Sequence, residues 1–144
     1  QKPSWNFVFV GPQDEQFRTS SLHQLKNVHF LGAKRENQLP KYLNAFSVAI
    51  NPQLTNEITI GNYPRKIDEY LAMGKPVVAT ATKAMNYFKH YVSVANNAND
   101  WIEKLELELL NNNRKLELKR IEYAYSHSWK NNVETIYRTI GRSL

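Results

Sequence analysis

The sequence predicts an α/β protein built on a doubly wound parallel sheet of about five strands, with helices on both faces and a helical C-terminal segment. Three observations predict this class. Short, nearly continuous apolar runs alternate with stretches of helical periodicity over the first 96 residues. These runs are rich in β-branched and aromatic residues, as strands covered on both faces are. From residue 97 onward the sequence has helical character throughout.

The strand candidates end at turn residues such as Gly-Pro or Asn-Pro. They are residues 6–10, 27–32, 47–52, 76–80 and 91–95. Helices are expected between them at residues 19–26, 36–46, 64–73 and 83–89. This alternation favours right-handed crossovers and a parallel sheet. We expect a single domain, in which residues 97–144 add helices that pack on the sheet domain of residues 1–96.

The C-terminal segment is expected to start at an Asn99 or Asp100 cap in "NDWIEKLELELLNNN". Four apolar side chains share one face of its last helix: Trp129, Val133, Ile136 and Ile140. A stripe of this kind predicts core or interdomain packing rather than a ligand site.

Composition excludes several classes of protein. The chain has no cysteine, which excludes disulfides, thiolate catalysis and cysteine zinc sites and fits a reducing cytosol. No apolar run approaches the roughly 18 residues of a membrane span, and the first residues do not resemble a signal peptide. The net charge of +6 fits either a solvated basic surface or an anionic partner, such as a phosphorylated ligand, nucleic acid or a membrane.

The segment "IGNYPRKIDEYLAMGKPVVAT" (60–80) predicts a short helix that leads directly into a strand. Asn62 is a natural cap, and Pro64 suits the first turn. Gly74 suits the residue after the helix, and Pro76 prevents its continuation. Apolar side chains at helical spacing, led by Ile67, would lie on the sheet.

Charged residues at the start of this helix point to chemistry. Arg65 and Lys66 lie where the helix dipole disfavours cations, and Glu69 follows one turn later. One interpretation is an ordinary surface ion pair between Lys66 and Glu69. The other is a nucleotide site, in which free N–H groups and the cations bind phosphate and Glu69 accepts hydrogen bonds from vicinal hydroxyls.

The run "PRKIDEYLAMGKPVVAT" resembles the signature segment of the C-terminal domain of group 1 (family 4-like) glycosyltransferases of the GT-B fold. "FVFVGP", "NVHFLGAKRENQLPKYLNAFSVAINP" and "SHSWKNNVETIY" resemble other parts of that domain in the same order. The resemblance implies a Rossmann-like domain in residues 1–96 that binds a nucleotide sugar. It also implies a glycosyltransferase of hexosyltransferase type that acts in polysaccharide synthesis at the cell surface.

The resemblance assigns roles to individual residues. Glu69 matches the second glutamate of the Glu-x7-Glu motif and should hold the ribose hydroxyls of the donor. Lys66 should bind the diphosphate, with Arg65 and the backbone of Asn62 and Tyr63 beside it.

The first glutamate of that motif would fall at Gly61, so the chain departs from the pattern there. Asn56 or Glu57 would then take its place in contacting the donor sugar. Five further residues are expected to border the nucleobase or the same cleft: Gly11, Pro12, Gly32, Ala33 and Lys34. No catalytic residue is identified.

The resemblance further implies an N-terminal acceptor-binding domain and a first strand that precede residue 1. The present chain would then be a truncated donor-binding half, inactive alone. Relatives usually need no metal, so no cofactor is expected. We expect a cytoplasmic protein, and peripheral association with the inner face of the membrane stays open.

Other functions fit the sequence less well or share its features. A non-catalytic nucleotide-binding or regulatory module would keep the same geometry around Lys66 and Glu69. A receiver-like domain would need acidic residues at strand ends, and a Rossmann dehydrogenase would need Gly-x-Gly-x-x-Gly after a strand; the sequence has neither. Nucleic-acid binding has only the net charge in its favour.

Aromatic and histidine side chains are expected to be structural. Core or helix packing is predicted for Tyr87, Phe88, Tyr91, Tyr123 and Tyr125. The four histidines show no metal-ligand spacing, and His29 is expected inside the core.

Overall fold

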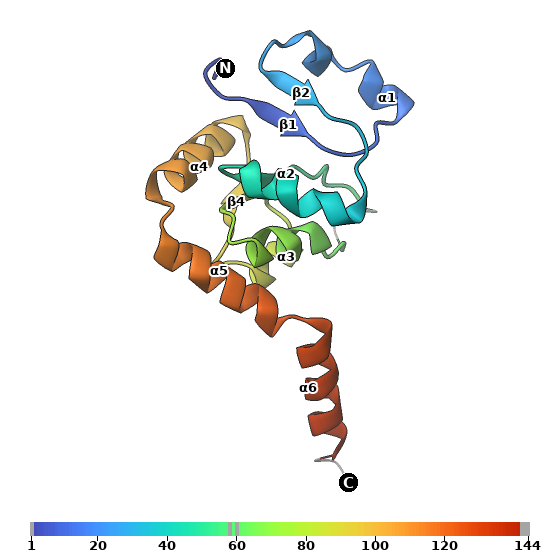
Figure 1. Cartoon of the computed structure of the whole chain (residues 1–144), viewed down its shortest axis with the longest axis vertical. Helices are drawn as coiled ribbons and strands as arrows, with labels where there is room; N and C mark the ends of the chain where they lie inside the picture. Colours follow the sequence, from blue (N-terminus) through green and yellow to red (C-terminus); the bar gives the residue numbers. More distant parts are fainter. Residues whose placement is uncertain (1, 58, 60, 142–144) are drawn as a thin grey trace. The chain divides into compact units, whose positions relative to one another are not determined.

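The computed structural model describes residues 2–57, 59 and 61–141 (Figure 1). The chain divides into two compact units, Gln1–Tyr42 and Leu43–Leu144. All five predicted strands are present and pair in parallel, which confirms the α/β class. They form two sheets, one of two strands in the first unit and one of three strands in the second. Helix α2 (Leu39–Ala45) spans the division between the units.

The first unit contains a two-stranded sheet with an aromatic cluster. Its elements are β1 (Phe7–Phe9), α1 (Glu15–Arg18), η1 (Ser21–Gln24), β2 (Val28–Phe30) and η2 (Glu36–Gln38). Phe9 pairs with Phe30 in the parallel ladder, and their rings stack with centroids 5.1 Å apart. The Phe17 ring from α1 packs edge-on against both of these rings, with a centroid distance of 5.7 Å to each. These aromatic contacts hold α1 against the sheet of its unit.

The helix predicted at residues 19–26 is replaced by two shorter turns. Asp14 caps α1 by accepting a hydrogen bond from the N–H of Phe17 at 2.6 Å. Ser20 then caps η1 by accepting from the N–H of Leu22. Because each cap starts a new turn, one continuous helix does not form here.

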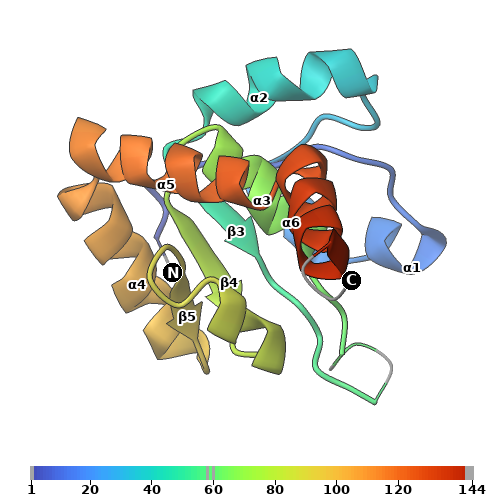
Figure 2. The same ribbon diagram turned by 90° about the horizontal axis from the view of Figure 1, so that it is seen from below.

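The second unit is a three-stranded parallel sheet with the order β3-β4-β5. Its strands are β3 (Ala49–Asn51), β4 (Val77–Thr80) and β5 (Ser93–Ala95). Its helices are α3 (Arg65–Ala72), η3 (Lys83–Tyr87), α4 (Ala98–Asn111), α5 (Arg114–Ser126) and α6 (Trp129–Gly141). Figure 2 shows α3 and α4 on opposite sides of this sheet.

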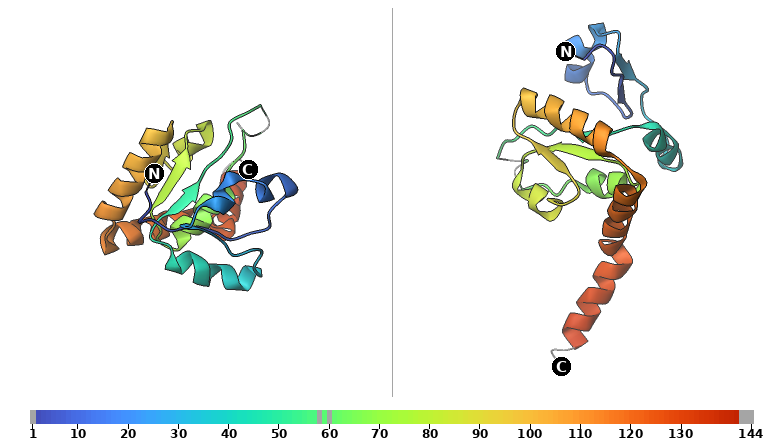
Figure 3. Two further views of the ribbon diagram at one scale, coloured as in Figure 1. Left: turned by 90° about the horizontal axis from the view of Figure 1, so that it is seen from above. Right: turned by 90° about the vertical axis from the view of Figure 1, so that its left-hand side faces the viewer.

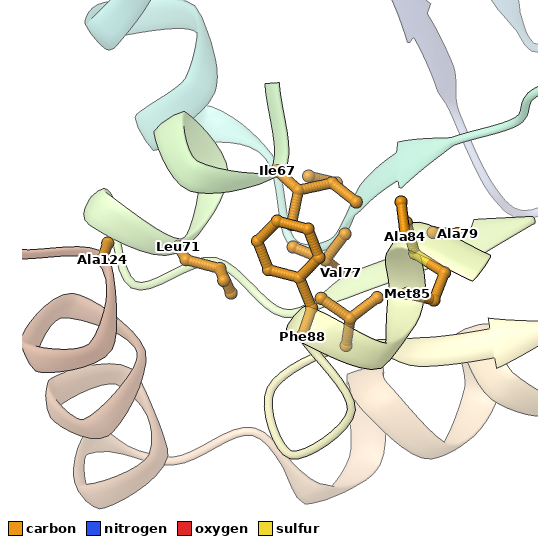
Figure 4. Close-up of a cluster of buried hydrophobic side chains, with 10 residues drawn as sticks. Ile67, Leu71, Val77, Ala79, Ala84, Met85, Phe88 and Ala124 are labelled. Carbon is orange, nitrogen blue, oxygen red and sulfur yellow. The ribbon is translucent and has the colours of Figure 1, made fainter. Parts of the chain in front are cut away.

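The core of the second unit lies between α3 and the sheet (Figure 4). Ile67 and Leu71, one turn apart on α3, are completely buried. They pack with Val77 and Ala79 of β4 and with Phe88, which is also completely buried. The predicted apolar face of this helix is therefore confirmed, and its burial fixes which flank of α3 stays exposed.

The two ends of α3 were predicted with different success. Gly74 follows the helix with a φ of 71°, a left-handed conformation that favours glycine. At the other end Pro64, not Asn62, is the N-cap residue, and no side chain caps the helix. The N–H of Asn62 instead donates to the carbonyl of Thr59 at 3.1 Å. The prediction of an Asn62 cap was wrong because this residue belongs to the preceding turn.

The start of α4 also differs from the prediction. Its N-cap is Asn97, whose side chain accepts hydrogen bonds from the N–H groups of Asn99 and Asp100 at 3.0 Å. Asp100 lies one turn inside the helix and accepts from the backbone and side chain of Asn96. Asn97 has the extended backbone that a cap requires, which is why it precedes both candidates.

Helix α6, which carries the predicted apolar stripe, follows α5 at the C-terminal end of the second unit (Figure 3). Trp129, Val133, Ile136 and Ile140 are all exposed, Trp129 by 78%. None of the described residues of α6 is buried, so the prediction that the stripe packs in a core is wrong for these residues, and the alternative of interdomain packing stays a prediction. By contrast, α4 lies against β4 and β5, and α5 lies against α3. The predicted single domain, with the helices of residues 97–144 packed on the sheet domain of residues 1–96, stays a prediction.

Candidate functional site

The candidate site lies at the carboxyl edge of the β3-β4-β5 sheet. The parallel strands β3 and β4 end at Asn51 and Thr80, and their following segments lead to α3 and η3. The N–H of Gln53 donates to Thr80 Oγ1 at 2.8 Å, which joins the two segments. Ligands of open α/β sheets bind at this edge.

The first turn of α3 presents two cations and one N–H group. Arg65 and Lys66 are exposed, and so is Glu69 one turn later. The N–H of Arg65 donates to the Tyr63 carbonyl at 3.1 Å, and that of Ile67 donates to the Pro64 carbonyl at 2.9 Å. For the N–H of Lys66, no acceptor is found in the described part of the chain. This donor and the adjacent ammonium group are therefore available to an anion.

The surface ion pair that the sequence allowed between Lys66 and Glu69 is not formed. Neither side chain makes an ion pair with any described residue. Both charges lie on the exposed flank of α3 because Ile67 turns the opposite flank toward the core. A cation and a carboxylate thus face solvent close to a helix start.

Asp68 is a residue of this site that the sequence reasoning missed. It lies in the first turn of α3, and its Oδ1 atom is buried without a hydrogen-bond partner among the described residues. Burial and the neighbouring Asp68 carboxylate raise the pKa of the Tyr63 hydroxyl, which therefore stays protonated. The Tyr63 ring packs against Phe88 with centroids 5.3 Å apart. These contacts position the residue that precedes Pro64.

The loop that holds Asn56, Glu57 and Gly61 is organised around Thr59. The N–H of Asn56 donates to Thr59 Oγ1 at 3.0 Å, and the N–H of Thr59 donates to Asn56 Oδ1 at 2.9 Å. Gln53 Nε2 donates to the Thr59 carbonyl at 2.8 Å. The Asn56 amide is thus used within the loop, whereas Glu57 and Gly61 are exposed. Contact of these residues with a donor sugar stays a prediction.

The predicted residues of the first unit form a second group. The N–H of Gly11 donates to the carbonyl of Gly32 at 3.0 Å, so the ends of β1 and β2 lie together. Lys34 Nζ donates to the Leu31 carbonyl at 2.6 Å and lies 5.6 Å from the centre of the Tyr42 ring. Pro12 and Ala33 are exposed. The assignment of this group to the nucleobase stays a prediction.

Two further polar atoms at the strand ends were not predicted. Asn51 Nδ2 and Thr82 Oγ1 are buried, and neither has a hydrogen-bond partner among the described residues. Asn51 ends β3, and Thr82 follows β4 by two residues. The signal in the sequence was a polar residue at the end of one apolar run and another two residues after the next run. The structure therefore makes this edge more polar than the sequence interpretation did.

Three residues expected in the interior are exposed. His29 is exposed, and its Nε2 lies 3.0 Å from Asn6 Oδ1. Tyr87 and Tyr125 are each 67% exposed. The prediction holds for Phe88, which is completely buried. His29 was misplaced because alternate residues of a strand point to opposite faces, and only one face of β2 is covered within its unit.

Comparison with known proteins identifies the family. The family described as "Glycosyl transferases group 1" matches residues 1–112. The chain belongs to the group 1 glycosyltransferases. It is also 36% identical over 84 residues to TuaH of Bacillus subtilis (strain 168), a protein named as a putative teichuronic acid biosynthesis glycosyltransferase. That match covers 56% of this chain and 21% of TuaH, so the chain spans about a fifth of this relative.

The membership confirms the resemblance read from the α3 segment, which lies inside the matched residues. Helix α6 lies outside them. In the described part of this glycosyltransferase chain, no helix is long and apolar enough to cross a membrane.

Proposed function

We propose that the chain binds the nucleotide-diphosphate-sugar donor of a hexosyl transfer at the start of α3. The observation that carries the proposal is the set of exposed charges on this helix: Arg65 and Lys66 in the first turn and Glu69 one turn later. Phosphate suits the cations and the helix start, and vicinal hydroxyls suit the carboxylate. A nucleotide sugar carries both groups.

Lys66 and Arg65 would act on the leaving group. Glycosyl transfer breaks the bond between the anomeric carbon of the sugar and a diphosphate oxygen, and negative charge develops on that oxygen. Fixed positive charge at this point stabilises the transition state more than the ground state. The N–H of Lys66, which has no acceptor in the described residues, would add a hydrogen bond to the same group.

Glu69 would orient the donor rather than react with it. An exposed carboxylate can accept two hydrogen bonds from adjacent ribose hydroxyls, which fixes the nucleoside relative to the helix start. The chemistry of this chain needs no metal ion in our proposal, because the cations supply the charge that a metal would otherwise supply. We therefore expect donor binding to be unchanged by a chelator.

The proposed biological role rests on one relative, TuaH. TuaH is named for teichuronic acid biosynthesis, and we propose for this chain the broader role of polysaccharide synthesis at the cell surface. The corresponding location is the cytoplasm, at the inner face of the membrane. We further propose that transfer requires an acceptor-binding domain in addition to residues 1–144, so that these residues alone bind the donor without transferring it.

The proposal is tested by calorimetric titration of the chain with UDP, GDP, ADP and CMP. We expect one nucleotide to bind selectively and both Lys66→Ala and Glu69→Ala to weaken it about tenfold or more, the usual effect of losing a charge-assisted hydrogen bond. Lys115→Ala and Glu122→Ala are matched controls, because both side chains are exposed on α5.

Two results would contradict the proposal. One is that none of the four nucleotides binds; the other is that the control variants weaken binding as much as the α3 variants. A transfer assay on a longer polypeptide that contains the acceptor-binding part then separates an enzyme from a non-catalytic binding module.

A further inference from the structure

Tyr63 and Tyr87 form an exposed aromatic pair beside the start of α3. Their rings are 42% and 67% exposed, and the ring centroids lie 5.9 Å apart with an angle of 61° between the planes. Exposed aromatic rings in contact with one another leave apolar surface in water. This pair therefore favours the binding of a partner that has an apolar face.

The pair is held in place by buried neighbours. The Tyr63 ring packs at 5.3 Å against the completely buried Phe88. The hydroxyl of Tyr123 on α5 donates to the backbone carbonyl of Tyr87, which anchors the end of η3. Asp68 lies beside the Tyr63 hydroxyl. A surface fixed in this way loses little conformational entropy when it binds a ligand.

The position of the pair ties it to the donor site. Tyr63 lies two residues before Arg65, the first residue of α3. Tyr87 is the last residue of η3, which follows the carboxyl end of β4. Both rings thus belong to the same edge of the sheet as Lys66.

We propose that Tyr63 and Tyr87 form a stacking platform for a pyranose ring next to the diphosphate of the donor. This inference rests on the proposed function, because it takes the position of the diphosphate from it. The face of a pyranose carries C–H groups with partial positive charge, which suit the negative face of an aromatic ring. The ring hydroxyls around that face can reach polar groups such as the Tyr63 hydroxyl.

The sugar could come from the donor or from the acceptor, and the experiment separates these sources. The chain is labelled with 3-fluorotyrosine, and the ¹⁹F resonances of its eight tyrosines are assigned with single Tyr→Phe variants. The first ligands are the nucleoside diphosphates UDP and GDP, and the second are the nucleotide sugars UDP-glucose and GDP-mannose. The third series combines UDP or GDP with possible acceptors, namely methyl glycosides and disaccharides of glucose, mannose and N-acetylglucosamine.

We expect the Tyr63 and Tyr87 resonances to shift with a sugar-bearing ligand beyond the shift with the nucleoside diphosphate. A shift with a nucleotide sugar assigns the donor sugar to the platform, and a shift with a free glycoside assigns the acceptor. The Tyr125 resonance should not move, and this residue is a matched control because its exposure is also 67%.

The affinity of substituted chains for sugar-bearing ligands tests the same inference. Tyr87→Ala should weaken sugar-dependent binding about tenfold, in line with the loss of one aromatic stacking partner. Tyr87→Phe should retain it, and Tyr125→Ala should have no effect. Binding of the nucleoside diphosphate alone should be unchanged in all three variants, so this measurement stays separate from the test of the donor site.

Any of three results would overturn the proposed platform. The first is that no sugar-bearing ligand shifts the Tyr63 and Tyr87 resonances. The second is that the nucleoside diphosphate alone produces the full shift, and the third is that Tyr125→Ala has the same effect as Tyr87→Ala. If the nucleoside diphosphate itself fails to bind, the proposed function fails with it, whereas retained diphosphate binding without a sugar effect rejects the platform alone.

Discussion

Replacing Gly74 by alanine should destabilise the chain through two separate effects. Gly74 follows α3 with a φ of 71°, a left-handed conformation that costs an alanine about 1–2 kcal/mol. A Cβ atom there would also lie 3.2 Å from Glu117 Cβ and 3.3 Å from Ile121 Cδ1 on α5. Because Gly74 is buried, this close approach adds a cost of about 1 kcal/mol from overpacking.

The two effects sum to a loss of about 2–3 kcal/mol in the free energy of unfolding, which corresponds to a fall in melting temperature of about 6–12 °C. Gly61→Ala is the control, since the Cβ atom that this substitution adds would have no atom within 4 Å in the described part of the chain beyond the residue itself and its two chain neighbours. Denaturant unfolding followed by circular dichroism measures both variants. If Gly74→Ala were as stable as Gly61→Ala, the packing of α5 on this turn would be refuted.

Two further predictions concern charged groups. Glu108→Gln should destabilise the chain by about 3 kcal/mol, because it removes the carboxylate that forms an ion pair with the buried Arg120 at 3.1 Å. Arg114→Ala, in an exposed ion pair, should change the free energy of unfolding by less than about 1 kcal/mol. Hydrogen bonds from Asn96 lower the pKa of Asp100 below its ordinary value of 3.8, so the stability that Asp100 adds should be present above that pH and be lost as pH falls through the folded-state value. Asp100→Asn should therefore be less stable than the parent at neutral pH and equally stable in strong acid, and acid unfolding curves check this; an equal difference at both pH values would contradict it.

The sequence predicted those parts of the fold that local patterns determine. Each apolar run became a strand, and α3 formed between Pro64 and Gly74 with Ile67 buried, because both its period and its end signals agreed. Competing caps were harder to predict. Asn97, Asn99 and Asp100 are all good cap residues, and only the backbone conformation selects the first of them.

The solvent exposure of individual side chains could not be predicted from the sequence. Tyr87, Phe88 and Tyr125 are all aromatic residues, yet only Phe88 is buried, since burial depends on which elements pack over each position. Asp68 was missed for a related reason. A carboxylate in the first turn of a helix is common, and only the burial of its Oδ1 atom and its place beside the Tyr63 hydroxyl distinguish Asp68 from others.

The central claim is that Lys66 binds the diphosphate and Glu69 binds the ribose, and a double-mutant cycle with altered nucleotides tests it most directly. Calorimetry would compare the selected nucleoside diphosphate with its 2′-deoxy form and with its monophosphate, on the parent, Lys66→Ala and Glu69→Ala. The claim predicts that Glu69→Ala abolishes discrimination against the 2′-deoxy form and retains the preference for diphosphate, and that Lys66→Ala does the reverse. If both variants weakened all three ligands by the same factor, neither residue would contact the group assigned to it, and the account of this site would be contradicted.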